Sequence, residues 1–397
     1  MGALFDFDTL VVGAGPVGAS AARHASLDPA AGSVVVVGPT EPVDHHAHPG
    51  LHGAWHDEGR LTRLIAGHHV WAHLARQSVA RYADIAEQGG QQFHVPGSVL
   101  YVFEQGQGFE QHRTVAEQVG AEFADVSDTP GSFPYLSVPP SSRALLETGS
   151  AGIINPRRLV ANQLRAASLH GATVVDDVVT SLEPDVDGVV AVLHAGTRLR
   201  CRRAVVAAGA YVNSFGLLPS PVPVSAIGIT AHFFAVDGTV ADELEGMPGM
   251  LWFDARGEGS FVYSLPPIRY PDGRLWFKIG GHRESAPLHG AEEVNRWHRS
   301  DGDGMGFESV ATWVAEHIPL LAGRESHTVG CVITESTSAL PMIAEVAPTG
   351  APGRVVAVSG CSGAAAKSCD EIGRIAAVLA VHGEWDSPLD RALLSGC

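Results

Sequence analysis

Residues 8–20 are Asp8-Thr-Leu-Val-Val-Gly13-Ala-Gly15-Pro-Val-Gly18-Ala-Ser20, an apolar run followed by three spaced glycines. The run predicts a strand, and the alanine-rich continuation predicts a helix to about Ser26. The first glycine permits a tight turn, the second lets the backbone approach a pyrophosphate, and the third brings helix and strand close together. A second apolar run, Val34–Val37, follows at the distance expected for a βαβ unit. Because phosphates bind at helix N-termini, Gly13, Gly15 and Gly18 indicate a dinucleotide site rather than a turn without a ligand.

The composition limits the size of the molecule and the kinds of partner it can have. The chain has 397 residues, of which 45% are hydrophobic and 17% charged, which is typical of a globular protein. This length suits two domains. The net charge of −17 disfavours nucleic acid and anionic membranes, because both bind basic surfaces. An anionic small-molecule substrate would need local arginines or lysines, and we expect a monomer or small homo-oligomer.

The cysteines and the first residues indicate the compartment. Five cysteines, an odd number without metal-type spacing, argue against a disulfide framework and favour a reducing cytoplasm. No charged-then-apolar leader precedes the first strand, and no apolar run reaches the roughly 20 residues that cross a bilayer. We therefore expect a soluble, cytoplasmic protein.

Two kinds of pattern alternate along the chain. A strand and helix rhythm returns near Gly152 and again near Val355, where a strand leads into a long helix. Short alternating runs with Pro and Gly separate these parts and are typical of antiparallel sheet. One amphipathic helix is predicted over Val70–Gln88. We expect an α/β (α+β) fold with a Rossmann-like domain of residues 1–88, 151–218 and 328–397 and an inserted, mainly antiparallel β-sheet substrate domain of residues 89–150 and 219–327.

Six motifs follow one another in an order that resembles a known enzyme family. They are the Gly13–Gly18 glycines, His56-Asp-Glu-Gly-Arg60-Leu-Thr-Arg63, Val205-Val-Ala-Ala-Gly209-Ala-Tyr-Val-Asn213, Phe277-Lys278-Ile-Gly-Gly-His282, Cys331-Val-Ile-Thr334 and Gly360-Cys-Ser-Gly363-Ala-Ala-Ala-Lys367. In this order they resemble the FAD-dependent amine and amino-acid oxidase superfamily, closest to its monomeric sarcosine oxidase group. A nicotinamide-dependent Rossmann enzyme would explain only the first motif. The resemblance implies that the Rossmann-like domain binds FAD.

The resemblance assigns roles to two arginines. Arg60 and Arg63 are three positions apart, so on a helix or turn they would share a face, and a guanidinium can hold a carboxylate through two hydrogen bonds. We expect Arg63 to bind the substrate carboxylate together with Lys367, and Arg60 to lie in the flavin environment with His56. The alternative is a solvated arginine pair on a surface helix.

A lysine in an apolar run is the second feature of the implied site. Lys278 stands within Leu275–Ile279, where a buried charge is costly unless it has a task. In the family the matching lysine promotes the reaction with dioxygen, and His282 matches an active-site histidine. The alternative is a lysine whose stem packs on the sheet while its ammonium reaches water.

The resemblance also implies contacts from the end of the chain. Cys331 stands where the family forms a thioether to the flavin, although a free cysteine is more often a small buried hydrophobe. The last helix, which starts after Gly360 and Gly363, would direct its N-terminus at the flavin. Gly209 ends a buried strand at the cofactor. Tyr263 matches a position that lines the pocket, with an ordinary core tyrosine as the alternative.

Some positions depart from the family pattern. Ile333 replaces an expected tyrosine, and Ala364-Ala-Ala366 replaces the usual His-Gly-Phe, which enlarges the pocket and favours a substrate bulkier than sarcosine. No acidic residue ends the second strand at Val37, so Glu41 is the candidate to bind the adenosine ribose.

Histidines are concentrated between residues 45 and 73. Pairs such as His52 and His56 have the i, i+4 spacing of metal ligands, but no carboxylate or cysteine completes a familiar set. We therefore expect no metal and favour a role in the pH response near the flavin.

The sequence thus predicts an FAD-dependent oxidase of a secondary amine, either an N-methyl or a cyclic amino acid. The resemblance implies hydride transfer to flavin N5, hydrolysis of the imine, and reoxidation by O2 to give H2O2. Three alternatives remain open: a D-amino-acid oxidase or dehydrogenase, a tailoring oxidase of a larger natural-product amine, and a flavin- or nucleotide-binding protein without turnover.

Overall fold

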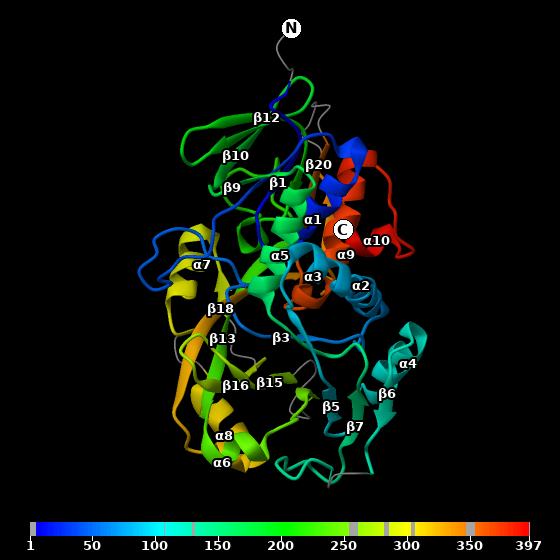
Figure 1. Ribbon diagram of the computed structural model, residues 1–397, viewed down its shortest axis with the longest axis vertical. Coiled ribbons are helices and arrows are strands. Elements are labelled where there is room, and N and C mark those ends of the chain that lie inside the picture. The colour runs from blue at the N-terminus through cyan, green and yellow to red at the C-terminus, as the bar shows by residue number, and fades with distance from the viewer. Residues whose placement is uncertain are drawn as a thin grey trace.

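The computed structural model describes residues 5–106, 108–128, 132–253, 261–281, 286–302, 306–346 and 354–396. Figure 1 shows a first sheet with its helices in the upper part of the view and a second sheet below it. His282 lies outside the described residues, so its expected role stays a prediction. Within the described ranges, no helix combines the length and the hydropathy needed to cross a membrane.

The first sheet is built around β1 (Phe7–Val12), which pairs in parallel with β2 (Val34–Val37) and β12 (Arg198–Val206). Leu10 and Val12 belong to the apolar cluster on one face of this sheet and Val11 to the cluster on the other, as expected for a parallel strand that is covered on both sides. The remaining strands are β9 (Thr173–Val175), β10 (Val179–Pro184), β11 (Val189–Leu193), β19 (Met342–Glu345) and β20 (Arg354–Ser359).

Helices cover the face of the first sheet that includes Val11 (Figure 1). They are α1 (Pro16–Leu27), α2 (His69–Val79), α5 (Pro156–Leu169) and α9 (Ala365–His382), with η1 (Pro29–Ala31) and α10 (Arg391–Leu394) nearby. A further helix, α3 (Tyr82–Gly89), packs on α5. α1 packs against both α5 and α9. The backbones of α1 and α9 approach closely because Gly373 has no side chain: a Cβ there would lie 2.6 Å from the Ala21 nitrogen.

The single helix predicted over Val70–Gln88 is wrong, because two helices, α2 and α3, occupy this segment. The chain turns at Ala80 and Arg81, and the Arg81 guanidinium pairs with Asp370 and Glu371 of α9. The turn lets α2 pack on α9 while α3 packs on α5, a tertiary arrangement that amphipathic spacing does not encode.

The second sheet carries most of the inserted residues. Its order is β17-β13-β16-β15-β14-β5-β7-β6, and β18 pairs with the other edge of β13. Its strands are β5 (Val99–Phe103), β6 (Phe123–Asp125), β7 (Arg143–Glu147), β13 (Val224–Val236), β14 (Gly249–Phe253), β15 (Phe261–Arg269), β16 (Leu275–Gly280), β17 (Ala286–Leu288) and β18 (Ser326–Ser336). The predicted α/β architecture with an inserted, mainly antiparallel sheet is confirmed.

Smaller elements complete the inserted part. The helices are α4 (Phe109–Val119), α6 (Gly238–Glu243), α7 (Gly290–Arg299), α8 (Phe307–His317), η3 (Gly209–Tyr211) and η5 (Pro319–Leu321). A short sheet of β3 (Arg60–Thr62), β8 (Gly152–Ile154) and β4 (His94–Pro96) joins the two larger parts. Because β18 pairs with β13 as far as Ser336, we propose that the nucleotide domain resumes after Ser336 rather than at residue 328.

A buried charge network ties the helices of the first layer together. Asp370 of α9 is completely buried and contacts Arg23 and His24 of α1, Arg81, and Gln163 of α5. Burial alone would raise the pKa of Asp370, but the charges of His24 and Arg81 together with the hydrogen bonds hold it well below its usual range. The carboxylate is therefore ionised and links three helices and the turn between α2 and α3.

Replacing Asp370 by Asn should lower the free energy of unfolding by about 3–5 kcal/mol at neutral pH, because buried guanidinium groups lose their counter-charge. Since the folded pKa is depressed, this stabilisation is present above the pKa of an unfolded aspartate and is lost as the pH falls through the folded pKa. Urea unfolding of wild type and D370N between acid and neutral pH measures the difference. E292Q, in the exposed pair of Glu292 and Arg296, is the control and should unfold like wild type. An equal loss in both variants would contradict the network's role.

Candidate active site

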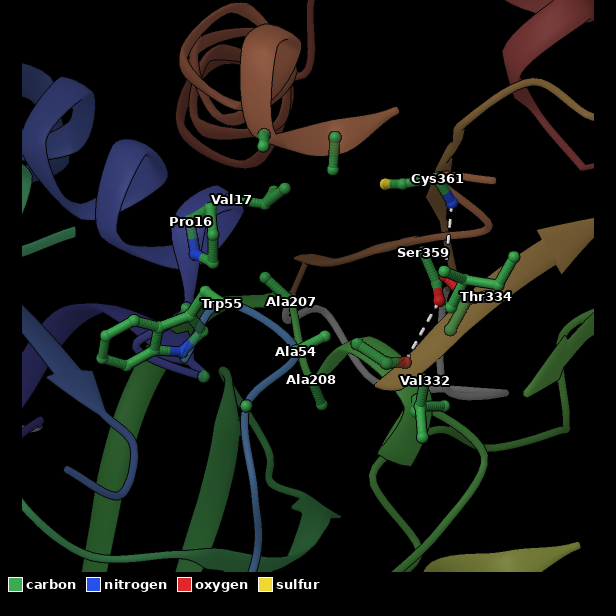
Figure 2. A pocket seen from close by; sticks show the side chains of 18 of the residues that line it. Pro16, Val17, Ala54, Trp55, Ala207, Ala208, Val332, Thr334, Ser359 and Cys361 are labelled. Atoms are coloured by element: carbon green, nitrogen blue, oxygen red, sulfur yellow. Dashed lines mark hydrogen bonds between the residues drawn. The ribbon is translucent and has the colours of Figure 1, made fainter. Parts of the chain in front are cut away.

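A cavity of about 540 Å³ lies where the carboxyl ends of the parallel strands face the second sheet. Its wall includes the β1–α1 turn, the ends of β2 and β12, the loop before β3, residues of β13, β14, β15 and β18, and the start of α9. Figure 2 shows Val17 and Cys361 directed toward the same space and Trp55 beside the β1–α1 turn. Hydrogen bonds from the Ser359 hydroxyl to the Gly209 carbonyl and from the Cys361 amide to the Thr334 hydroxyl hold one side of the wall.

The three glycines of the β1–α1 turn have different surroundings. Gly13 has a φ of +101°, and a Cβ there would lie 2.4 Å from the Ala207 carbonyl oxygen. A Cβ on Gly18 would lie 1.8 Å from the Gly13 oxygen, so both glycines are required by packing. Gly15 has an ordinary φ of −75°, and a Cβ there would contact only Trp55, at 3.4 Å. The open space over Gly15 is the cradle that a pyrophosphate would fill.

Two helix N-termini face the cavity. α1 begins at Pro16, and in its described first turn there is neither an acidic residue nor a side-chain cap. The same holds for α9, whose first residues follow Gly360 and Gly363 in left-handed conformations. Uncapped N–H groups and the helix dipole favour negative charge, so the chain offers one anion site at each end of the cavity. These features fit a flavin dinucleotide.

One group of charged side chains surrounds Asp57. The Asp57 carboxylate accepts contacts from Lys278 of β16 and Arg60 of β3, and a hydrogen bond of 2.9 Å from the Tyr270 hydroxyl. Arg60 lines the cavity and also donates to the Ala54 carbonyl at 2.9 Å. Lys278 is not itself a wall residue, but its Nζ lies 5.9 Å from the ring centre of Tyr263, which is one.

A second group surrounds Glu147. Arg63 and Lys367 both line the cavity, Arg63 lies 5.9 Å from the Tyr101 ring centre, and Lys367 is buried. Glu147 is fully buried and accepts hydrogen bonds from the Leu64 amide and the Tyr101 hydroxyl, both at 2.6 Å. The structure thus brings the two expected carboxylate-binding cations to one part of the wall, with a carboxylate near them.

The arginines reach the cavity for a different reason from the one predicted. Arg60 to Thr62 form β3, not a helix, and successive residues of a strand point to opposite sides, so residues three apart do not share a face. Arg63 reaches the same cavity because the strand ends at Thr62, and the Arg63 guanidinium then donates to the Ile65 carbonyl. The helical argument is wrong, although both arginines line the wall.

The chain contains 24 arginines but only two lysines, Lys278 and Lys367, and both are buried. Burial and then the charge of Arg60 lower the pKa of Lys278 well below its ordinary value. Burial and then Arg63 lower the pKa of Lys367, while Glu147 opposes the shift. An arginine stays charged in such surroundings, whereas a lysine can lose its proton. Both lysines of the chain therefore lie at or beside the cavity, where their charge can change.

The other expected residues of the wall also fall at the cavity. His56, Tyr263, Cys331 and Gly209 line it, as does Gly363, whereas Gly360 does not. Burial lowers the pKa of His56 to about 3, so its imidazole is neutral at neutral pH, and burial raises the pKa of Tyr263 to about 12. The Cys331 thiol is free and half-buried on β18.

Glu41 lies outside the wall and has another partner. Arg157 donates to both Glu41 oxygens, at 2.6 and 2.8 Å, and the His45 ring lies 3.3 Å from one of them. Although burial opposes it, these contacts lower the pKa of Glu41 to about 2. Its contact with the ribose stays a prediction. Glu41, His45 and His56 also bring possible metal ligands within 4.8 Å of one another, but Arg157 already compensates the carboxylate.

Sequence reasoning missed several residues of the site. Asp57 could have been found from the sequence, because it lies within the His56–Arg63 motif, three positions before Arg60. Glu147 and Trp55 had no such signal, since each reaches the site only through the pairing and packing of distant segments.

The chain was compared with known proteins. The model of the DAO family, described as FAD dependent oxidoreductase, matches residues 8–379. A monomeric sarcosine oxidase of Streptomyces avermitilis is 25% identical over 394 residues, 96% of each chain. An N-methyl-L-tryptophan oxidase of Escherichia coli O157:H7 is 25% identical over 295 residues, 72% of this chain and 73% of its own. The structure of NikD, described as an unusual amino acid oxidase, has a TM-score of 0.71 at 19% identity, with 98% and 97% of the two chains covered.

Because Gly15 and Gly18 have different surroundings, substitutions at these two positions can test cofactor binding and folding separately. G15V should unfold at the same urea concentration as the FAD-free wild type but retain far less FAD after gel filtration, because its side chain enters the open cradle. G18A should lose folding stability, because its Cβ would collide with the Gly13 carbonyl. Urea unfolding and the flavin absorbance per protein measure the two effects. If G15V retained FAD as well as wild type does, the pyrophosphate would not lie over Gly15.

Proposed function

Because the chain belongs to the DAO family of FAD-dependent oxidoreductases and is a flavin amine or amino-acid oxidase, we propose that its substrate is a secondary amine with a carboxylate and an apolar body bulkier than sarcosine. The observation that carries this proposal is that the basic residues Arg63 and Lys367 lie on the same wall as the small residues Ala364–Ala366. The names of the relatives, N-methyl-L-tryptophan oxidase and sarcosine oxidase, support the same class.

The proposed roles follow from the charges of the side chains. Arg63 and Lys367 bind the substrate carboxylate, and the apolar wall residues Ile227, Ile229 and Leu251 accept its body. FAD would supply the redox chemistry: it would take up the two electrons of the C–H bond beside the nitrogen, which leaves an imine, and would pass them to O2. Arg60 and neutral His56 form part of the flavin's surroundings, and Lys278 supplies positive charge where oxygen is reduced. The Gly13–Gly18 turn and the start of α9 hold the two ends of the cofactor.

Positioning is the larger part of this task, because the cofactor supplies the redox chemistry. The amine, in its neutral form, must be placed against the flavin. The side chains of Arg63 and Lys367 on one wall orient the carboxylate so that one face of the substrate is presented. We also propose that the imine product leaves the flavin face and is then hydrolysed, and that H2O2 is the second product. We further propose a cytoplasmic location, which the four free cysteines of the described residues support, and a monomer or small homo-oligomer.

Anaerobic reduction of the bound flavin tests the substrate class. N-methyl-L-tryptophan and other N-methyl amino acids with large apolar side chains should bleach the flavin faster than sarcosine, and D-alanine should not bleach it. Air should restore the colour. Bleaching by D-alanine alone would support a D-amino-acid oxidase instead, and bleaching by no amino acid would favour a tailoring oxidase of a larger amine, for which the small-residue wall leaves room.

We also propose a covalent thioether between FAD and Cys331. Cys361 also lines the cavity, but burial raises its thiol pKa to about 12, which disfavours the reactive thiolate. Acid-denatured wild type and C361S should keep yellow colour in the protein pellet, whereas C331S should release its flavin into the supernatant. Retention by C331S, or release by wild type, would contradict the proposal.

A further inference from the structure

Asp57 is a carboxylate of the site that the proposed function does not yet use. It is 8% exposed and stands in the loop that precedes β3. One of its oxygens contacts both Lys278 and Arg60, and the other accepts the hydrogen bond from Tyr270. A single side chain therefore joins β3, β16 and the segment that follows β15.

The surroundings of Lys278 make this contact important. Lys278 is 1% exposed, and its Nζ lies 5.9 Å from the ring centres of Phe233 and Tyr263. Titratable or charged groups from several segments surround it. They are Asp57 of the loop before β3, Arg60 of β3, Tyr263 of β15, Tyr270 directly after β15, and Cys331 of β18. Among the residues that the structure describes, Asp57 is the only carboxylate in an ion pair with this lysine.

The other lysine provides an internal comparison. Within the described ranges Lys367 forms no ion pair, and its Nζ has a hydrogen bond of 3.3 Å to the Ser368 hydroxyl. Both lysines are buried beside an arginine, and burial lowers the pKa of each. They differ in how a carboxylate reaches them: Asp57 forms an ion pair with Lys278, whereas Glu147 acts on Lys367 without an ion pair in the described residues. An ammonium buried without a counter-charge tends to lose its proton, whereas a paired one keeps it.

We propose that Asp57 is a positioning residue that keeps the Lys278 ammonium charged and places it, together with Arg60, beside the flavin end of the cavity, so that it determines how fast the reduced enzyme reacts with O2. This inference rests on the proposed role of Lys278. In the reaction, one O2 takes up two electrons and two protons and becomes one H2O2, while the cofactor returns to its oxidised form. A charged lysine favours this step because negative charge first builds on the oxygen.

The first test reads the protonation of the lysines directly. Lysine labelled with ¹³C at Cε gives two side-chain signals in the holoenzyme, because the chain contains two lysines, and K278M assigns them. D57N should lower the pKa of Lys278 by about one to three units and leave that of Lys367 unchanged. D57E, which retains the charge, should restore the Lys278 value. An unchanged Lys278 pKa in D57N would overturn the inference.

The second test connects that charge to oxygen. Stopped-flow mixing of the reduced enzyme with O2 should show D57N reoxidising about tenfold more slowly or worse at a pH above the Lys278 pKa of both proteins, because there each unit of pKa shift changes the fraction of charged lysine about tenfold. Anaerobic reduction by substrate should slow much less than reoxidation does, although Asp57 also contacts Arg60. Y270F, which removes a hydrogen bond but no charge, is the matched control and should reoxidise nearly as fast as wild type.

A double variant separates the inference from the proposed function. In K278M/D57N, the loss of Asp57 should slow reoxidation no further than K278M alone. An additional slowing of the size seen in D57N would show that Asp57 acts independently of Lys278 and would overturn the inference. If K278M itself reoxidised at the wild-type rate, the role of Lys278 in oxygen reduction would fail, and with it the second half of the inference, whereas the NMR titration would still decide whether Asp57 controls the charge of the lysine.

Discussion

The rest of the structure depends on the close contact of the β1–α1 turn with the end of β12. Gly13 lies against the Ala207 carbonyl, and Gly18 lies against Gly13, so a side chain at either glycine would push helix, turn and strand apart. This contact brings the carboxyl ends of β1, β2 and β12 to one edge of the sheet, where the start of α9 and the strands of the second sheet close the cavity. The site therefore exists only because three distant chain segments pack without side chains between them.

Buried carboxylates near cations are the second feature on which the structure depends. Three of them differ in how many positive groups surround the carboxylate. Asp370 is outnumbered by the cations around it and ties helices together. Asp57 is shared by Arg60 and Lys278, which leaves that group net positive when the lysine is protonated. Glu147 lies near Arg63 and Lys367 but pairs mainly with backbone amides. The carboxylate of the proposed substrate would thus meet local positive charge inside an acidic protein.

The sequence predicted the features that local rules govern. The glycine spacing, the apolar strands and the last long helix are encoded by neighbouring residues. The order of the motifs identified the family, and most of the site residues predicted from it line the cavity. The break between α2 and α3 was missed because Arg81 pairs with α9, nearly 300 positions away. The partner of Lys278 was missed for a similar reason, since Asp57 meets it only after β3 and β16 pack together. Glu41 was assigned by its place after β2, but α5 supplies Arg157, which takes up its carboxylate.

The choice of cation along this chain has a consequence for its acid–base behaviour as a whole. Arginine does not give up its proton in alkaline water, and 24 of the 26 basic side chains other than histidine are arginines. The cationic charge of the folded exterior is therefore constant across the alkaline range. Among the lysine and arginine side chains, only the two interior ammonium groups can release a proton there. Apart from the N-terminal amino group and the histidines, a loss of positive charge above neutral pH therefore comes from the cavity region rather than from the surface.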